Sequence, residues 1–351
     1  MWKLWLVISL GAVTAEVHAQ APRPPVRLAV VIVVDQMRPD YVDRFGDLFT
    51  GGLARLLREG TYFDRAYHDH SCTFTGPGHA TLSTGSLPAH HGIVANDWFE
   101  RATAREVGCC TDTSVTIVES PGLEGVSPHG LLRPTFAEYF RRQYPGARVV
   151  SLALKDRAAV LLAGREADAV FWYEEPPGRF VTSSWYAHAI PSWVSGLQPV
   201  IASFADSTWT RLLADSAYRR SGPDLVPSEH DGVNTQFPHP GNPAGGAPGA
   251  ASDREFFYLP YGDRAVLELA RRATVALQLG QDSIPDLLLL SCSAADAIGH
   301  RYGPGSQEMQ DYYLHLDRYL GELFDYLDRF VGADQWFVAL ASDHGVASLP
   351  V

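Results

Sequence analysis

The chain has 351 residues, 46% of them hydrophobic, which is enough to bury the core of one large domain or two moderate ones. This composition excludes a disordered or fibrous protein. The 40 acidic residues outnumber the 28 basic ones, and the formal charge of -12 argues against broad binding to nucleic acid or to an anionic membrane. An anionic ligand would have to be held by local positive charge.

The first 21 residues have the pattern of a cleavable signal peptide. Lys3 precedes an apolar run over residues 4–13, and small residues near Ala19 suit a signal-peptidase site. The run is too short to span a bilayer comfortably, and no later segment reaches the ~20 apolar residues of a membrane helix. We therefore expect a mature domain over residues 22–351 with no integral membrane segment, located in the periplasm or secreted.

Apolar runs alternate with helical patterns along the rest of the chain. Continuous apolar runs predict buried strands at Leu28–Val34, Arg148–Leu154, Ala169–Tyr173, Asp286–Leu290 and Trp336–Ala341. Helical patterns cover Gly52–Glu59, Thr135–Gln143 and Arg264–Leu279. This alternation predicts an α/β sandwich with a largely parallel sheet. The stretch over about 97–263 is less regular, and we expect it to be an elaboration inserted in the core.

The four cysteines, Cys72, Cys109, Cys110 and Cys292, lack the spacing of a zinc finger. An oxidising compartment permits disulfides, but the sequence does not give their connectivity. Adjacent cysteines rarely pair with each other, so one or two longer links are the expectation.

Metal-binding residue types follow three of the predicted strands. Asp35 comes directly after the first, Asp296 and His300 follow the strand that ends at Leu290, and Asp343 and His344 follow the last. Ligands of open parallel sheets bind beyond the carboxyl ends of the strands. Carboxylates with imidazoles suit zinc, and manganese or iron would accept the same ligands. Each motif alone has an ordinary explanation as a cap, a turn or a solvated helix face, but their coincidence favours a metal site.

Thr75 is the candidate nucleophile. It lies just before a predicted helix that begins near Pro77. Free backbone N–H groups and the helix dipole at such a position favour an alkoxide and an incoming phosphate. By itself Thr75 would be interpreted as an ordinary N-cap, and only the metal-ligand pattern reverses that preference.

Taken together and in this order, the motifs resemble those of bacterial zinc-dependent alkaline phosphatases of the threonine-nucleophile type, which are related to nucleotide pyrophosphatases/phosphodiesterases. The elements are Val34-Asp35-Gln36-Met37-Arg38, Thr75-x-x-x-His79, Asn96-Asp97-Trp98, Leu154-Lys155-Asp156-Arg157, Asp296-x-x-x-His300 and Asp343-His344-Gly345. The resemblance covers residues 28–346 and implies an alkaline phosphatase-like three-layer sandwich.

The resemblance implies hydrolysis of phosphate monoesters by two zinc ions through a phosphothreonine intermediate at Thr75. One zinc would be surrounded by Asp35, Thr75, Asp343 and His344, and the other would be bound by Asp296 and His300. The family supplies a third ligand to the second zinc from a histidine well downstream of the Asp-His-Gly motif. No histidine follows His344 in this sequence. We therefore expect that site to lack its third ligand here, with a C-terminally incomplete fold and impaired catalysis.

The resemblance also implies that Asn96, Lys155 and Arg157 bind the non-bridging phosphate oxygens. In isolation, Lys155 and Arg157 would be interpreted as exposed charges flanking an aspartate, but they follow a predicted strand at the same sheet edge. Two cations favour a monoester dianion over a diester. The expected ligands are thus small phosphate esters rather than nucleic acid.

Three other functions compete with this interpretation. A phosphodiesterase or nucleotide pyrophosphatase shares the metal set and the Thr-x-Pro-x-His element, but Lys155 and Arg157 argue against it. A sulfatase would need a Cys/Ser-x-Pro-x-Arg element, which residues 75–79 do not form. A catalytically impaired remnant that binds metal or phosphate is the non-enzymatic alternative.

Overall fold

The computed structural model describes residues 25–205, 207–242 and 250–348. Its centre is a six-stranded sheet with the strand order β10-β1-β9-β4-β5-β6. The strands are β1 (Leu28–Val34), β4 (Val149–Ala153), β5 (Ala169–Glu174), β6 (Arg179–Val181), β9 (Asp286–Cys292) and β10 (Trp336–Ala341). Every neighbouring pair is parallel except β5 with β6. The predicted α/β class with a largely parallel sheet is therefore confirmed.

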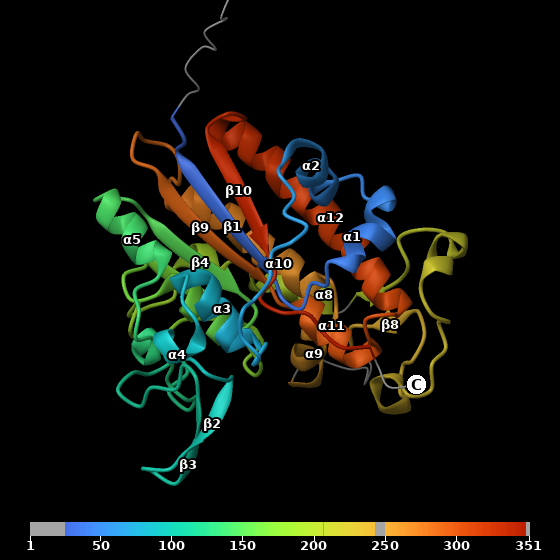
Figure 1. The fold of residues 1–351 in the computed structure, drawn as a ribbon, viewed down its shortest axis with the longest axis horizontal. Coiled ribbons are helices and arrows are strands. Elements are labelled where there is room, and N and C mark those ends of the chain that lie inside the picture. Colours follow the sequence, from blue (N-terminus) through green and yellow to red (C-terminus); the bar gives the residue numbers. More distant parts are fainter. Residues whose placement is uncertain (1–24, 206, 243–249, 349–351) are drawn as a thin grey trace, which may run out of the picture.

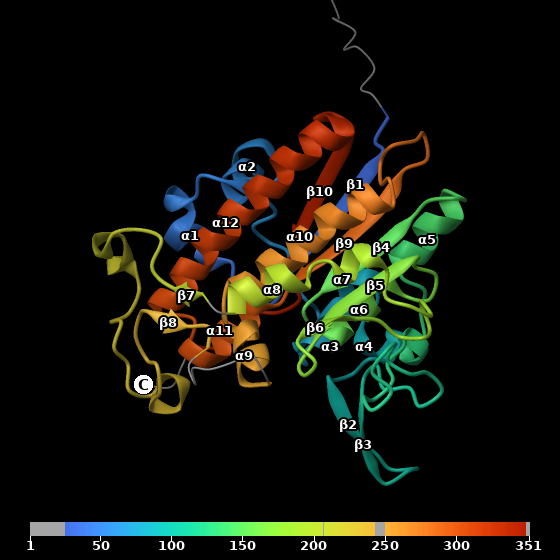
Figure 2. The ribbon, with the colours of Figure 1, turned by 180° about the vertical axis from the view of Figure 1, so that it is seen from behind.

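Helices cover both faces of this sheet, which gives three layers (Figures 1 and 2). The helices are α1 (Asp40–Phe45), α2 (Gly52–Glu59), α3 (Thr75–Thr84), α4 (Pro88–His91), α5 (Phe136–Gln143), α6 (Asp156–Ala163), α7 (Ser192–Ser195), α8 (Gln198–Ala205), α9 (Ala250–Glu255), α10 (Tyr261–Ala276), α11 (Ala294–Tyr302) and α12 (Gln307–Leu327). Helices α3, α5 and α6 lie on one face, and α10 and α12 lie on the other.

The two faces of β1 show why the strand is apolar throughout. Ala29 and Val33 pack in a cluster with Leu162 of α6, whereas Val30 and Ile32 belong to the larger cluster that includes α10 and α12. A strand covered on both faces has no polar alternation. This is why the bounds of β1 agree with the apolar run in the sequence. The bounds of β10 agree with an apolar run as well, although β10 lies at the sheet edge and is only partly buried.

Helix boundaries follow their caps. Thr135 is the N-cap of α5, so the helix begins one residue later than its pattern suggests, and Thr135 and Glu138 satisfy each other's backbone N–H groups in a capping box. Helix α3 begins at Thr75, two residues before the expected start near Pro77, because proline is tolerated in a first turn.

The range 97–263, expected to be an inserted elaboration, contains β4, α6, β5 and β6 of the sandwich as well as peripheral segments. One of these is a hairpin of β2 (Asp97–Glu100) and β3 (Arg105–Gly108), which projects from the body (Figure 1). The proposed signal peptide, residues 1–21, lies outside the described residues.

The expectation of long disulfide links is wrong, because all four cysteines are free thiols. Cys109 and Cys110 are buried with their Sγ atoms 3.9 Å apart. None of the helices in the described ranges combines the length and the apolar character of a membrane span.

Candidate active site

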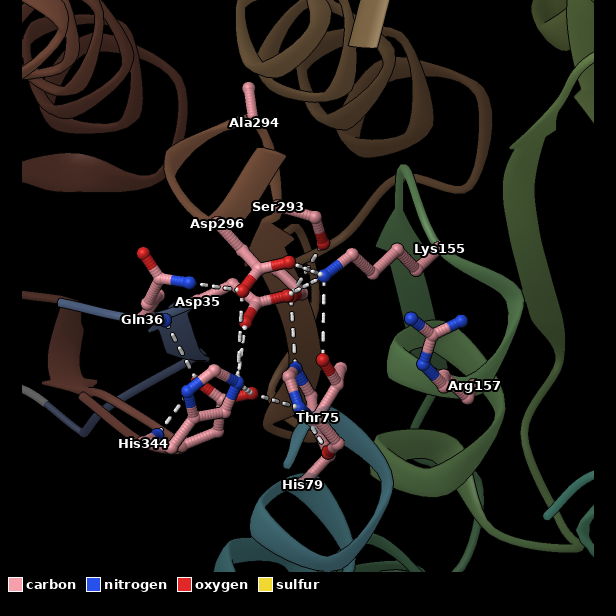
Figure 3. Close-up of polar contacts among 12 residues, drawn as sticks. Asp35, Gln36, Thr75, His79, Lys155, Arg157, Ser293, Ala294, Asp296 and His344 are labelled. Carbon is pink, nitrogen blue, oxygen red and sulfur yellow. Dashed lines mark hydrogen bonds and ion pairs between the residues drawn. The ribbon is translucent and has the colours of Figure 1, made fainter. Parts of the chain in front are cut away.

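Side chains from five segments meet beyond the carboxyl ends of the parallel strands (Figure 3). The segments are the residues after β1 (Asp35), the start of α3 (Thr75), the residues after β4 (Lys155), the first turn of α11 (Asp296) and the residues after β10 (Asp343 and His344). All six side chains are buried. Ionisable groups so far from water must neutralise one another or hold a cation.

Asp35, Asp343 and His344 form a group that could hold a metal ion, since their ligand atoms lie within 4.8 Å of one another. Asp35 Oδ1 lies 3.2 Å from His344 Nε2. Neither Asp35 Oδ1 nor Asp343 Oδ2 has a hydrogen bond of good geometry among the described residues. Two buried carboxylate oxygens without an aligned donor, beside an imidazole, fit the ligand set of zinc.

His79 lies behind this group and orients Asp343. Its Nδ1 lies 2.9 Å from the carbonyl oxygen of Thr75 and 3.0 Å from Asp343 Oδ2, and the geometry favours donation to the carbonyl. Its Nε2 lies 2.9 Å from Ser291 Oγ. The ring is fully buried, and its contacts at both nitrogens fix its orientation, so its contact with Asp343 Oδ2 restricts the position of that carboxylate.

Asp343 and His344 shift each other's pKa in opposite directions. Burial alone would raise the pKa of Asp343, but His79 and His344 lower it to about 2. Burial would likewise lower the pKa of His344, but Asp35 and Asp343 raise it to about 9. In the metal-free protein at neutral pH, Asp343 is therefore ionised and His344 carries a proton.

Lys155 places a positive charge between the carboxylates of Asp35 and Asp296. Its Nζ donates to Asp35 Oδ2 and Asp296 Oδ2 at 2.6 Å each, and it lies 3.3 Å from Thr75 Oγ1. Burial opposes the charge, but Asp35 and Asp296 more than compensate and raise the pKa of Lys155. The ammonium thus reaches both the candidate nucleophile and two candidate metal ligands.

Asp296 and His300 lie on one face of α11, as their spacing predicts. His300 Nε2 lies 3.1 Å from Asp296 Oδ1, and this contact is the main cause of the raised pKa of His300. Gln36 also donates from Nε2 to Asp296 Oδ1 at 2.6 Å. The pair offers a carboxylate and an imidazole close to the Lys155 ammonium.

Thr75 is the first residue of α3, and the cap position is occupied by Phe74, which makes no side-chain capping bond. The N-cap interpretation of Thr75 therefore does not apply. Asn96 Oδ1 accepts a hydrogen bond from Gly76 N at 2.7 Å, so Asn96 lies at the same helix terminus. The hydroxyl of Thr75 faces Lys155, whose Nζ donates a hydrogen bond to it (Figure 3).

Arg157 lies beside Lys155 with its guanidinium largely uncommitted (Figure 3). Its ion-pair partner is the neighbouring Asp156 at 3.6 Å, and its Nε has no hydrogen-bond partner in the described part of the chain. The structure thus brings Asn96, Lys155 and Arg157 to the side of the site where Thr75 lies.

Two residues that shape the site have no predicted role. His79 is part of the motif Thr75-x-x-x-His79, and its i, i+4 spacing is the signal that it shares a helix face with Thr75. Gln36 adopts a left-handed backbone with φ of 63°, and its backbone N–H donates to Asp343 Oδ1 at 3.2 Å. A non-glycine residue in that region marks a functional constraint, but the sequence alone gives no sign of it.

Comparison with known proteins gives one family and several close relatives. The sequence profile of the family described as type I phosphodiesterase / nucleotide pyrophosphatase matches residues 29–350. Alkaline phosphatase PhoV of Synechococcus elongatus is 35% identical over 335 residues, which are 92% of this chain and 60% of the relative. Alkaline phosphatase PafA of Elizabethkingia meningoseptica is 34% identical over 357 residues, which are 99% of this chain and 64% of the relative.

The fold agrees with one of these relatives as well. The crystal structure of wild-type alkaline phosphatase PafA matches with a TM-score of 0.85 at 32% identity, over 93% of this chain and 64% of that chain. The chain therefore spans less than two thirds of the lengths of these relatives.

Proposed function

Because the chain belongs to the type I phosphodiesterase / nucleotide pyrophosphatase family, we propose that it hydrolyses phosphate monoesters with Thr75 as the nucleophile. Relatives named alkaline phosphatase support the reaction class. The observation that carries the proposal is the position of Thr75 Oγ1 at a helix N-terminus, 3.3 Å from Lys155 Nζ and next to a buried carboxylate cluster.

Thr75 attacks the phosphorus from the first turn of α3. Backbone N–H groups at a helix N-terminus and the positive end of the helix dipole stabilise negative charge on the attacking oxygen and on the phosphoryl group. The ammonium of Lys155 adds a full positive charge at hydrogen-bond distance. As the bond from Thr75 Oγ1 to phosphorus forms, the bond from phosphorus to the ester oxygen breaks and the alcohol leaves, protonated by water. A water molecule would then hydrolyse the phosphothreonine to inorganic phosphate and the free Thr75 hydroxyl.

Lys155, Arg157 and Asn96 would bind the non-bridging oxygens. Arg157 can donate two parallel N–H bonds, and its guanidinium has only a loose contact with Asp156 to give up. A monoester dianion presents one more negative charge than a diester, so two cations on one side of the phosphorus favour the monoester. This separates the proposal from the phosphodiesterase alternative.

The donor set suits divalent ions. Asp35, Asp343 and His344 would hold one ion next to Thr75, and Asp296 and His300 would contribute to holding a second. Bound zinc ions would lower the pKa of the hydroxyl and of water and would neutralise charge on the attacking and leaving oxygens. We propose two zinc ions on the basis of the ligand types and the family resemblance. The N-terminal sequence pattern supports a periplasmic or secreted location.

The test compares Thr75→Ala with Thr75→Ser in protein supplied with zinc. We expect Thr75→Ala to lose roughly 10⁴-fold or more in kcat on para-nitrophenyl phosphate, because it removes a covalent nucleophile, and Thr75→Ser to keep measurable turnover. The free energy of unfolding should change by only about 1 kcal/mol, since the hydroxyl accepts one hydrogen bond and caps nothing. Comparable turnover by Thr75→Ala would exclude Thr75 as the nucleophile.

A second substitution distinguishes the monoesterase from the phosphodiesterase. Arg157→Ala should lower kcat/KM for para-nitrophenyl phosphate more than for bis-para-nitrophenyl phosphate. For the monoester, we expect a loss of transition-state stabilisation of about 2–4 kcal/mol. Equal losses on the two substrates would favour the phosphodiesterase.

A further inference from the structure

A cavity of about 380 Å³ opens beside the two cations of the candidate phosphate site. Lys155 and Arg157 form part of its wall. The remaining wall comes from the end of β5, the loop over residues 117–126 and Phe257. This volume is typical of pockets that enclose a small ligand, and its place beyond the ends of β4 and β5 is where parallel sheets bind theirs.

The cavity wall carries two cations, Lys155 and Arg157, and four carboxylates, which belong to Glu124, Asp156, Glu174 and Glu175. Lys155 and Arg157 are held near the reactive end by their interactions with Asp35, Asp156 and Asp296. The end of β5 instead contributes carboxylates to the wall, from Glu174 and Glu175. The charges that bear on Glu175 are Arg254, Glu174, Asp253 and Arg301, so the cations of the phosphate site do not neutralise it.

Neither glutamate forms an ion pair with a described residue, although Arg254 and Arg301 lie near enough to lower the pKa of Glu175. Glu174 accepts a hydrogen bond from Trp172 Nε1 at 3.0 Å, and Glu175 makes no hydrogen bond or ion pair with any described residue. Burial raises the pKa of Glu174, and it raises that of Glu175 to about 7. A positively charged ligand group at this position would relieve the cost of burying the two carboxylates.

We infer that this cavity is a leaving-group subsite for phosphate esters whose alcohol carries an ammonium group. Lys155 and Arg157 hold the phosphoryl end, and Glu174 and Glu175 bind the ammonium end. Trp172 and Phe257 provide apolar wall for the methylene chain between them. The inference rests on the proposed function, because it takes Lys155 and Arg157 as the phosphoryl-binding cations.

The test measures binding of phosphonates, whose P–C bond is not hydrolysed, so that affinity is read independently of turnover. Calorimetry at pH 8 compares 2-aminoethyl- and 3-aminopropylphosphonate with propyl- and butylphosphonate of matching size. We expect the better amino compound to bind about tenfold more tightly than its neutral counterpart, as one new charge-assisted contact provides. The double substitution Glu174→Gln/Glu175→Gln should reduce this preference to within about twofold.

Glu166→Gln provides the control, because Glu166 is an exposed acid outside the cavity wall and the substitution removes one carboxylate charge away from the cavity. Its preference for the amino compounds should equal that of the unsubstituted protein. Equal binding of amino and neutral phosphonates, or a preference that survives the double substitution, would overturn the inference.

Two further outcomes separate the inference from the proposed function. If neither type of phosphonate binds to zinc-loaded protein, the inference and the proposed function are both overturned, because Lys155 and Arg157 then do not bind a phosphoryl group. If the amino compounds bind preferentially while zinc-loaded protein hydrolyses no phosphate ester, the subsite stands and the proposed function fails.

Discussion

Replacing Lys155 by methionine isolates the electrostatic cost of the site. The Lys155 side chain is 9% exposed, and its ammonium lies 2.6 Å from one oxygen of each of Asp35 and Asp296. Removing one partner of a buried ion pair costs about 3–5 kcal/mol, because the other charge stays buried. A cost of that size is a large part of the 5–15 kcal/mol that stabilises a typical domain. We therefore expect metal-free Lys155→Met to lose about 3–5 kcal/mol of unfolding free energy.

A divalent ion should restore this loss, because it supplies the missing charge to the same carboxylates. Zinc at 100 times its dissociation constant stabilises a folded protein by about 2.7 kcal/mol. The gain on adding zinc should be larger for Lys155→Met than for the unsubstituted protein, in which the ammonium already neutralises Asp35. Denaturant unfolding in chelator measures the loss of unfolding free energy, and unfolding at fixed zinc concentrations measures the gain on adding zinc.

Arg141→Met serves as the control for this experiment. It breaks an ion pair with Asp168 whose side chains are 32% and 35% exposed, so it should cost less than about 1 kcal/mol. Zinc should not reverse that loss. If Lys155→Met in chelator were as stable as Arg141→Met, the ammonium would not be the counter-ion of the site, and the reasoning would be refuted.

The central strands of the fold can be predicted from the sequence, because a strand buried on both faces is a continuous apolar run. The run Leu28–Val34 coincides with β1 for that reason. The run Trp336–Ala341 also coincides with β10, although that strand lies at the sheet edge and is only partly buried. The place of Asp35 and Asp343 follows as well, since residues just past parallel strands share one edge of the sheet. These are consequences of local pattern and a general topological rule.

The contacts within the site cannot be predicted from local sequence pattern, because they join residues far apart in the chain. Lys155 and Asp35 are 120 positions apart, and their ion pair depends on β9 lying between β1 and β4. The sequence suggests Lys155 only as a ligand of phosphate. Its second role as counter-ion of two buried carboxylates, and the left-handed turn at Gln36, emerge only when the strands are in order.

Three predictions remain. His79→Ala should weaken zinc binding about 10–100-fold in calorimetry, because Asp343 loses the group that orients it; unchanged affinity would contradict that role. Asp263→Ala should cost about 1–3 kcal/mol of unfolding free energy, because the buried carboxylate accepts from Ala294 N at the start of α11; a neutral effect would show that α11 needs no such acceptor. The last concerns His344, whose folded pKa of about 9 exceeds the ordinary 6.5. Because the pKa of His344 is higher in the folded state, its protonation contributes stability that is fully present below pH 6.5 and is lost as pH rises through 9. The free energy of unfolding of the metal-free protein should therefore fall by about 3 kcal/mol over that interval. His344→Gln should remove this part of the slope in denaturant unfolding, and an equal slope in both proteins would mean that the imidazole is not charged in the folded state.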